Sequence, residues 1–196
     1  MLVPSYRLAP EHKFPAPVDD AVAAYQWLLG EGAIANRTVI AGDSSGGGLT
    51  VATALALRDA RDAVPAATVV LSPWGDLACT GSTMQTQAAV DVACTQPGLL
   101  EMANWYLDGA DPRTPHASPV YADFAGMPPM LAVVGGDEIL LDDAVRLVRS
   151  TAEAGADASL YVGGGMQHVF PIWKGVFPEA GAAVEHIGRW IAQYTT

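Results

Sequence analysis

Apolar residues recur along the chain with two different periods, which predict two kinds of element. Residues 17–30 have the helical period, and Gly30 is placed to end that helix. Its apolar face consists of Val18, Ala21, Val22, Tyr25, Leu28 and Leu29. Four shorter runs are almost continuously apolar, which is typical of strands covered on both faces. These predicted strands are residues 38–42, 66–72, 129–136 and 159–164.

Helical patterns fill the intervals between the predicted strands, over residues 46–62, 140–155 and 178–194. Because strands that alternate with helices are joined by parallel crossovers, we expect an α/β three-layer sandwich with a mostly parallel sheet. We expect residues 1–196 to form a single domain. Residues 73–127 interrupt the alternation with a Pro- and Gly-rich stretch and one helix near 97–107. A connection of this length is usually functional, so we interpret it as a lid or pocket segment.

Composition narrows the classes of function. A net charge of −11 over 196 residues disfavours nucleic acids and anionic membrane surfaces as partners. No secretory signal and no apolar run of about 18 residues is found, so we expect a cytoplasmic protein without membrane insertion. Cys79 and Cys94 lack the spacing of a zinc site, and we interpret them as free thiols in a reducing compartment. No metal or cofactor is implied.

The segment "VIAGDSSGGGLTVATALAL" places a serine between a predicted strand and a predicted helix. Gly42, Ser44 and Gly46 satisfy the pattern G-x-S-x-G, in which a sharp turn exposes the serine oxygen. Glycine-rich turns also hold phosphates, but here no lysine follows the glycines and the G-x-G-x-x-G spacing is absent. The pattern therefore favours Ser44 as a nucleophile, with the N–H of Ser45 as a donor to the developing oxyanion.

A serine nucleophile needs a histidine base, and that base needs a carboxylate. Of the four histidines, only His168 directly follows a predicted strand, whereas His186 lies within a helix and His12 and His116 lie in Pro-containing loops. Asp137 directly follows the third predicted strand and is our predicted acid. Its competitors are Glu138, one residue further from the strand, and the helix-start acids Asp142 and Asp143.

Five sequence blocks together resemble the hormone-sensitive-lipase-like (bacterial family IV) carboxylesterases of the α/β-hydrolase superfamily. In order they are "YRLAPEHKFPAPVDDAVAAYQWL", "GDSSGGG", "LSPWGDL", "GDEILLDD" and "MQHVF". The resemblance implies Ser44 as nucleophile, Asp137 as acid and His168 as base. It also implies hydrolysis of small acyl esters or lactones through an acyl-enzyme. Our own expectation is that residues 73–127 line part of the acyl pocket.

The sequence departs from the family at its beginning. Family members carry a helical cap and a His-Gly-Gly-Gly oxyanion loop before the YRLAPE block, whereas this sequence begins almost at that block. We therefore expect an α/β-hydrolase fold truncated at its N-terminal half, with an open sheet edge at residues 38–42 through which two copies would pair. The alternative hypothesis is a weakly active or inactive hydrolase fragment that acts as a subunit or as a binding module.

Overall fold

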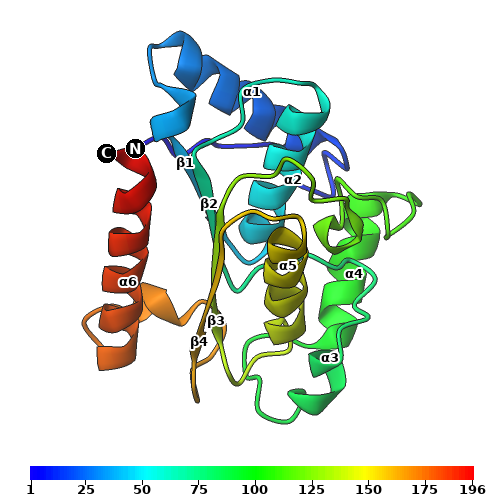
Figure 1. Cartoon of the computed structure of the whole chain (residues 1–196). Helices are drawn as coiled ribbons and strands as arrows, with labels where there is room; N and C mark the ends of the chain where they lie inside the picture. The colour runs from blue at the N-terminus through cyan, green and yellow to red at the C-terminus, as the bar shows by residue number, and fades with distance from the viewer.

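The computed structural model describes all 196 residues, and its centre is a four-stranded sheet. The strand order is β1-β2-β3-β4 and every pairing is parallel, so the carboxyl ends of all four strands lie at the same end of the sheet (Figure 1). The parallel α/β architecture predicted from the apolar pattern is confirmed. The strands are β1 (Val39–Asp43), β2 (Ala67–Leu71), β3 (Met130–Gly135) and β4 (Ala158–Gly163).

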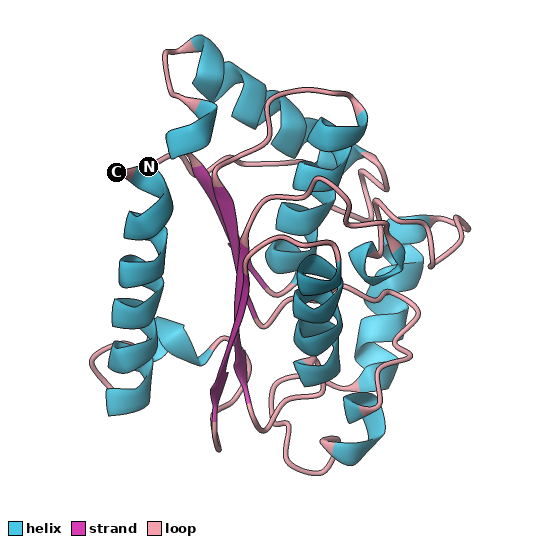
Figure 2. Cartoon of the chain, in the orientation of Figure 1, coloured by secondary structure: helices cyan, strands magenta, loops and turns pink.

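Helices lie on both sides of the sheet, which gives the three predicted layers (Figures 1 and 2). The C-terminal helix α6 covers one face, whereas α2 and α5 cover the other and α1 packs against α2. The helices are α1 (Ala16–Gly30), α2 (Ser45–Asp59), α3 (Thr83–Thr86), α4 (Gln96–Leu107), α5 (Leu141–Glu153) and α6 (Pro178–Thr195).

Strand β3 shows why the predicted strands are apolar at nearly every position. Met130, Ala132 and Val134 pack with residues of α2 and α5, including Leu55 and Leu147. The alternating residues Leu131 and Val133 pack with residues of α6, including Trp190. All the side chains of this strand are buried, because the two faces of the sheet are both covered.

Residues 73–127 form a structured segment on the α2 and α5 side of the molecule (Figure 1). It contains α3, α4 and a 3-10 turn at Pro119–Tyr121, so the single helix expected near 97–107 is present with two further short elements. Leu99, Ala103 and Leu107 of α4 pack against Trp74 and Leu77 in an apolar cluster separate from those at the sheet. Ile139 and Leu140, from the chain after β3, complete this cluster and anchor the segment to the rest of the molecule.

Strand β1 pairs only with β2, and residues 1–15 add no strand beside it. Its residues are partly or fully exposed, unlike those of β3. Pairing of two copies through β1 stays a prediction. None of the helices combines the length and apolar character that a membrane crossing requires. Cys79 and Cys94 are both free thiols, as predicted.

Candidate active site

Ser44 occupies the sharp turn between β1 and α2 that the sequence pattern predicts. Its backbone adopts φ 54° and ψ −121°, a conformation that is costly for a residue with a side chain. The close approach of strand and helix requires glycine at position 42, because a Cβ there would lie 2.2 Å from the carbonyl oxygen of Gly46. The N–H of Ser44 donates to the carbonyl oxygen of Leu71, which fixes the turn to the end of β2.

His168 lies in the turn after β4 and is hydrogen-bonded on both ring nitrogens. Its Nε2 is 2.9 Å from Ser44 Oγ, and its Nδ1 is 2.8 Å from Glu138 Oε2. A carboxylate only accepts hydrogen bonds, so Nδ1 carries the hydrogen and donates the hydrogen bond to Glu138 Oε2. In the neutral imidazole, Nε2 then has a free lone pair that accepts the hydroxyl hydrogen of Ser44. This is the arrangement that allows a histidine to remove a serine proton.

The acid partner of His168 in the structure is Glu138, so the prediction of Asp137 was wrong in its geometry. Glu138 is fully buried, whereas Asp137 is half-buried and makes no side-chain hydrogen bond to His168. After β3 the chain turns, and the N–H of Asp137 donates to the carbonyl oxygen of Met166. Consecutive side chains leave such a turn in different directions, so only one of the two acids faces the histidine.

The approach of this turn to the histidine loop depends on a glycine. A Cβ at Gly135 would lie 2.2 Å from the carbonyl oxygen of Met166, so the end of β3 and the loop after β4 touch through their backbones. The N–H of Gly135 also donates to Glu138 Oε1. The Glu138 carboxylate is thereby held by the backbone as well as by His168.

Each strand of the sheet contributes one polar side chain at its carboxyl end. Ser44 follows β1, Ser72 follows β2, Glu138 lies three residues beyond β3, and His168 lies five residues beyond β4. Open parallel sheets have their ligand sites at the carboxyl ends of the strands. The sequence named Ser44 and His168 as candidates and Glu138 as a competitor of Asp137, but it did not single out Ser72, which lies inside the quoted block "LSPWGDL".

Ser45 is the first residue of α2, directly after the turn. The first N–H groups of a helix have no acceptor within the helix, and the helix dipole favours negative charge at this end. The N–H of Ser45 therefore lies in the position expected of an oxyanion donor, beside Ser44. The role itself stays a prediction.

Two cavities meet at this turn, and Ser45 lines both. One has a volume of about 320 Å³ and is lined mostly by apolar residues, among them Leu49 of α2 and Trp74, Met102 and Trp105 of residues 73–127. The other, of about 770 Å³, includes Ser44 and runs along the free edge of β1. Residues 73–127 thus supply part of a cavity wall next to the candidate nucleophile.

None of the other three histidines is hydrogen-bonded to Ser44, although His116 lines the apolar cavity. His116 pairs with Asp59 at 2.8 Å, and the His186 ring lies against that of Tyr161 with centroids 5.2 Å apart. His12 is exposed in the N-terminal stretch. The structure therefore brings only His168 to Ser44, as the sequence predicted.

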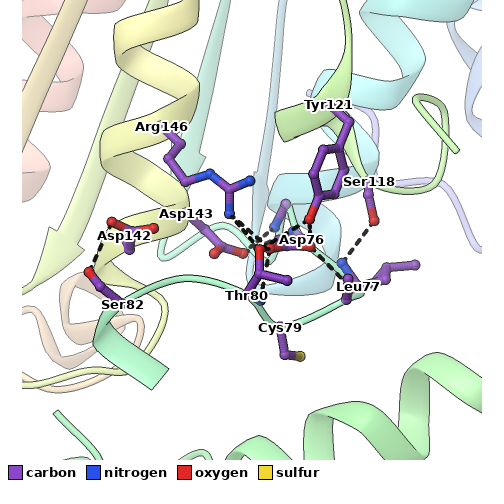
Figure 3. Close-up of polar contacts among 12 residues, drawn as sticks. Asp76, Leu77, Cys79, Thr80, Ser82, Ser118, Tyr121, Asp142, Asp143 and Arg146 are labelled. Atoms are coloured by element: carbon purple, nitrogen blue, oxygen red, sulfur yellow. Dashed lines mark hydrogen bonds and ion pairs between the residues drawn. The ribbon is translucent and has the colours of Figure 1, made fainter. Parts of the chain in front are cut away.

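A buried polar cluster ties the chain after Ser72 to the helix after Glu138 (Figure 3). Asp76 Oδ2 accepts from Arg146 of α5 at 2.8 Å, and Asp76 Oδ1 accepts from the hydroxyl of Tyr121 at 3.0 Å. Asp143 Oδ2 accepts from the N–H groups of Gly75 and Asp76, each at 2.9 Å. The two strand ends that carry Ser72 and Glu138 are held together by these contacts.

The two carboxyl groups of this cluster differ in charge state. Burial favours the neutral form of Asp76, but hydrogen bonds from Thr80, Arg146 and Tyr121 outweigh it, and the pKa is lowered. The hydrogen bonds to Asp143 do not outweigh its burial. Burial and the negative charge of Asp76 raise the pKa of Asp143 to about 8. Its Oδ1 has no hydrogen-bond partner. The sequence indicated an ordinary first-turn helix acid at Asp143, whereas the structure buries it completely.

We expect Asp143 to make the free energy of unfolding fall as the pH rises. Between about pH 4 and pH 8 the folded chain keeps a proton on Asp143 that the unfolded chain has lost. This group therefore stabilises the fold at low pH, and the contribution declines by up to about 1.4 kcal/mol per pH unit. Asp143→Asn keeps an oxygen for the two N–H groups but does not titrate, so urea unfolding at pH 5 and pH 8 should show a smaller decline.

The matched control for this measurement is Asp142→Asn, which removes one acid from the same helical turn where the side chain is half-buried. It should keep the wild-type decline. Equal pH dependence in wild type and Asp143→Asn would show that Asp143 is ionised in the folded chain at neutral pH.

Comparison with known proteins agrees with the geometry. A family described as the alpha/beta hydrolase fold matches residues 1–172. An acetyl-hydrolase of Streptomyces hygroscopicus is 44% identical over 190 residues, covering 97% of this chain and 64% of the relative. An esterase of Acinetobacter venetianus is 33% identical over 186 residues, covering 94% of this chain and 61% of the relative. The chain thus spans less than two thirds of the length of either relative.

Solved structures extend this likeness to three dimensions. An esterase from the bacterial hormone-sensitive lipase family superimposes with a TM-score of 0.96 at 45% identity, covering 98% of this chain and 65% of that structure. The chain therefore belongs to the α/β-hydrolase fold family, and within it to the hormone-sensitive-lipase-like group that its sequence blocks resemble.

Proposed function

We propose that this chain carries the catalytic machinery of a carboxylesterase, with Ser44 as nucleophile, His168 as general base and Glu138 as the acid that orients the base. The observation that carries the proposal is the continuous hydrogen-bonded path from Ser44 Oγ through the His168 ring to Glu138 Oε2. The names of the relatives, acetyl-hydrolase and esterase, support the same reaction class.

The reaction proceeds in two stages. Ser44 Oγ attacks the ester carbonyl carbon while its proton moves to His168 Nε2, and the carbonyl oxygen becomes an oxyanion. Glu138 stabilises the imidazolium that forms. His168 then gives the proton to the leaving alcohol, and the acyl group stays bound to Ser44. A water molecule, deprotonated by His168, attacks the acyl-enzyme, and the carboxylic acid leaves as Ser44 regains its proton.

The oxyanion needs donors that point at the site where its charge develops, and removing one donor typically costs about 10²–10³ in rate. In this chain the N–H of Ser45, at the start of α2, is the proposed donor. It lies on the wall that the two cavities share, next to Ser44. Binding of the oxyanion there places one substituent of the ester toward the apolar cavity.

The apolar cavity suits a small apolar acyl or alcohol group of an ester substrate. Its volume of about 320 Å³ lies at the lower end of the range for small-molecule sites, and apolar residues, among them Trp74, Trp105 and Leu49, supply most of its wall. Charged groups would lose hydration in such a cavity, and the one imidazole ring in its wall, that of His116, is already paired with Asp59. We therefore propose short-chain uncharged esters as the substrate class.

Hydrolysis of p-nitrophenyl esters with acyl chains of increasing length tests this proposal. We expect acetate or butyrate to be cleaved well above the buffer rate, and kcat/KM to fall by at least about 10-fold, or about 1.4 kcal/mol, for the palmitate ester. Boiled protein provides the blank. Rates equal to the blank for every ester would reject the esterase proposal, and a preference for palmitate would reject the assigned acyl cavity.

A further inference from the structure

The proposed reaction uses polar side chains that follow β1, β3 and β4, but not Ser72, which follows β2. It follows β2, between the strand that leads to Ser44 and the strand that leads to Glu138. The side chain is fully buried and lines neither cavity. It therefore has no direct route to a substrate.

The hydroxyl of Ser72 connects the acid to the loop of the base. It donates to Glu138 Oε1 at 2.7 Å, and it accepts from the N–H of Val169 at 2.9 Å. A serine hydroxyl has one proton to donate and lone pairs to accept with, so both bonds form at once. Glu138 thus accepts a hydrogen bond from Ser72 on one carboxylate oxygen and from His168 on the other.

Backbone conformation at both ends of this bridge is unfavourable. Ser72 adopts φ 44° and Val169 adopts φ 54°, the left-handed region in which a β-branched residue is a rare outlier. Such conformations are costly for a residue with a side chain and persist only where surrounding contacts hold them. The hydrogen bond from Val169 to Ser72 is such a contact, and it fixes the residue that directly follows His168.

We propose that Ser72 is a positioning residue, which holds the Glu138 carboxylate and the His168 loop in the geometry that lets His168 face Ser44. The inference rests on the proposed function and adds a fourth member to its site. It also explains why a serine stands at a left-handed position that glycine would occupy without strain. The side chain is kept for its two hydrogen bonds.

Removing the hydroxyl should slow the chemical step and leave substrate binding unchanged. For Ser72→Ala we expect kcat to fall between about 10- and 100-fold, since small misplacements of reacting groups cost rate on this scale. KM should stay within about 3-fold, because Ser72 lines neither cavity. Ser72→Gly removes the same hydroxyl and relieves the backbone strain, so it gives a folded variant if alanine does not.

A matched control is Ser118→Ala. Ser118 is also fully buried and its hydroxyl also accepts a backbone N–H, that of Leu77 at 2.8 Å, but it makes no hydrogen bond to Glu138 or His168. Its loss should change kcat by less than about 3-fold. A similar fall in both variants would assign the effect to general loss of packing, and the inference would fail.

The double mutant separates positioning from a merely structural role. Because Ser72 acts partly through Glu138, adding Ser72→Ala to Glu138→Gln should lower kcat by clearly less than the product of the two single effects. Independent effects that multiply would overturn the inference. The inference would also fail if Ser72→Ala alone kept the wild-type kcat while wild type hydrolysed esters, and the proposed function would then stand.

Proton NMR decides the role of Ser72 even if the chain hydrolyses no ester. The Nδ1 proton of a histidine held by a carboxylate resonates far downfield, and Glu138→Gln identifies the signal by removing it. We expect Ser72→Ala to shift or broaden that signal and Ser118→Ala to leave it in place. An unchanged signal in Ser72→Ala would refute the positioning role.

Discussion

Replacing Ser44 with alanine is expected to abolish ester hydrolysis, with a fall in kcat of at least about 10⁴-fold. Alanine removes the oxygen that attacks the ester and leaves His168 and Glu138 without a nucleophile to activate. The measurement is the initial rate on p-nitrophenyl butyrate at equal protein concentration, after circular dichroism has shown that the variant is folded.

Ser82→Ala is the control for this variant, because Ser82 is exposed and its only side-chain partner is Asp142, at 3.3 Å. It should keep the wild-type rate. Hydrolysis that persisted in Ser44→Ala at the wild-type rate would remove Ser44 from the reaction and would point to a contaminant or to another site.

The second large fall in kcat is expected on replacing Glu138, and not on replacing the neighbouring Asp137. Glu138→Gln replaces the carboxylate by an amide that no longer stabilises the imidazolium and permits the wrong tautomer of His168. Loss of the corresponding acid in a serine triad lowers kcat by about 10⁴-fold. Asp137→Asn should stay within about 3-fold of wild type, because the Asp137 side chain makes no hydrogen bond to His168.

These two variants form a matched pair, since each converts one acid of the same turn to its amide. Ester hydrolysis by both, with urea unfolding to compare their stability, is the measurement. A large loss in Asp137→Asn together with a normal rate in Glu138→Gln would restore the acid that the sequence indicated and contradict the geometry of the structure.

The difference between these acids shows what a pattern of apolar residues predicts and what it leaves open. The run 129–136 located the end of β3 to within a residue, and the parallel alternation placed that end beside Ser44 and His168. Which of two consecutive acids faces the histidine depends on the turn after Gly135, whose backbone touches the loop of Met166. That contact joins residues some 30 positions apart, and no local pattern encodes it.

The burial of Asp143 and the contacts of Ser72 were not predicted, for a related reason. An acid in the first turn of a helix normally faces solvent and complements the helix dipole. Asp143 is instead buried by residues 75–76, which reach it from the long connection after β2. Ser72 gives no chemical signal in sequence, because its importance lies in its contacts with Glu138 and Val169. Both residues act through tertiary contacts that form only when the strand ends meet.

The nucleophile turn, in contrast, was predictable from a few residues. Strand, turn and helix are adjacent in sequence, and the glycine at position 42 is required by a contact only four residues away, at Gly46. The geometry of Ser44 is therefore a local property, whereas the choice of its acid partner is not.

The most direct test of the central claim, that Ser44 is a nucleophile activated by His168 and Glu138, is covalent labelling of the purified chain with a fluorophosphonate. Serine attack at phosphorus displaces fluoride and leaves a stable ester, which peptide mass spectrometry locates. We expect one label per chain, on Ser44, with labelling slowed strongly in Glu138→Gln and unchanged in Asp137→Asn. A label on another residue, or equal labelling of Ser44 in wild type and Glu138→Gln, would contradict this account.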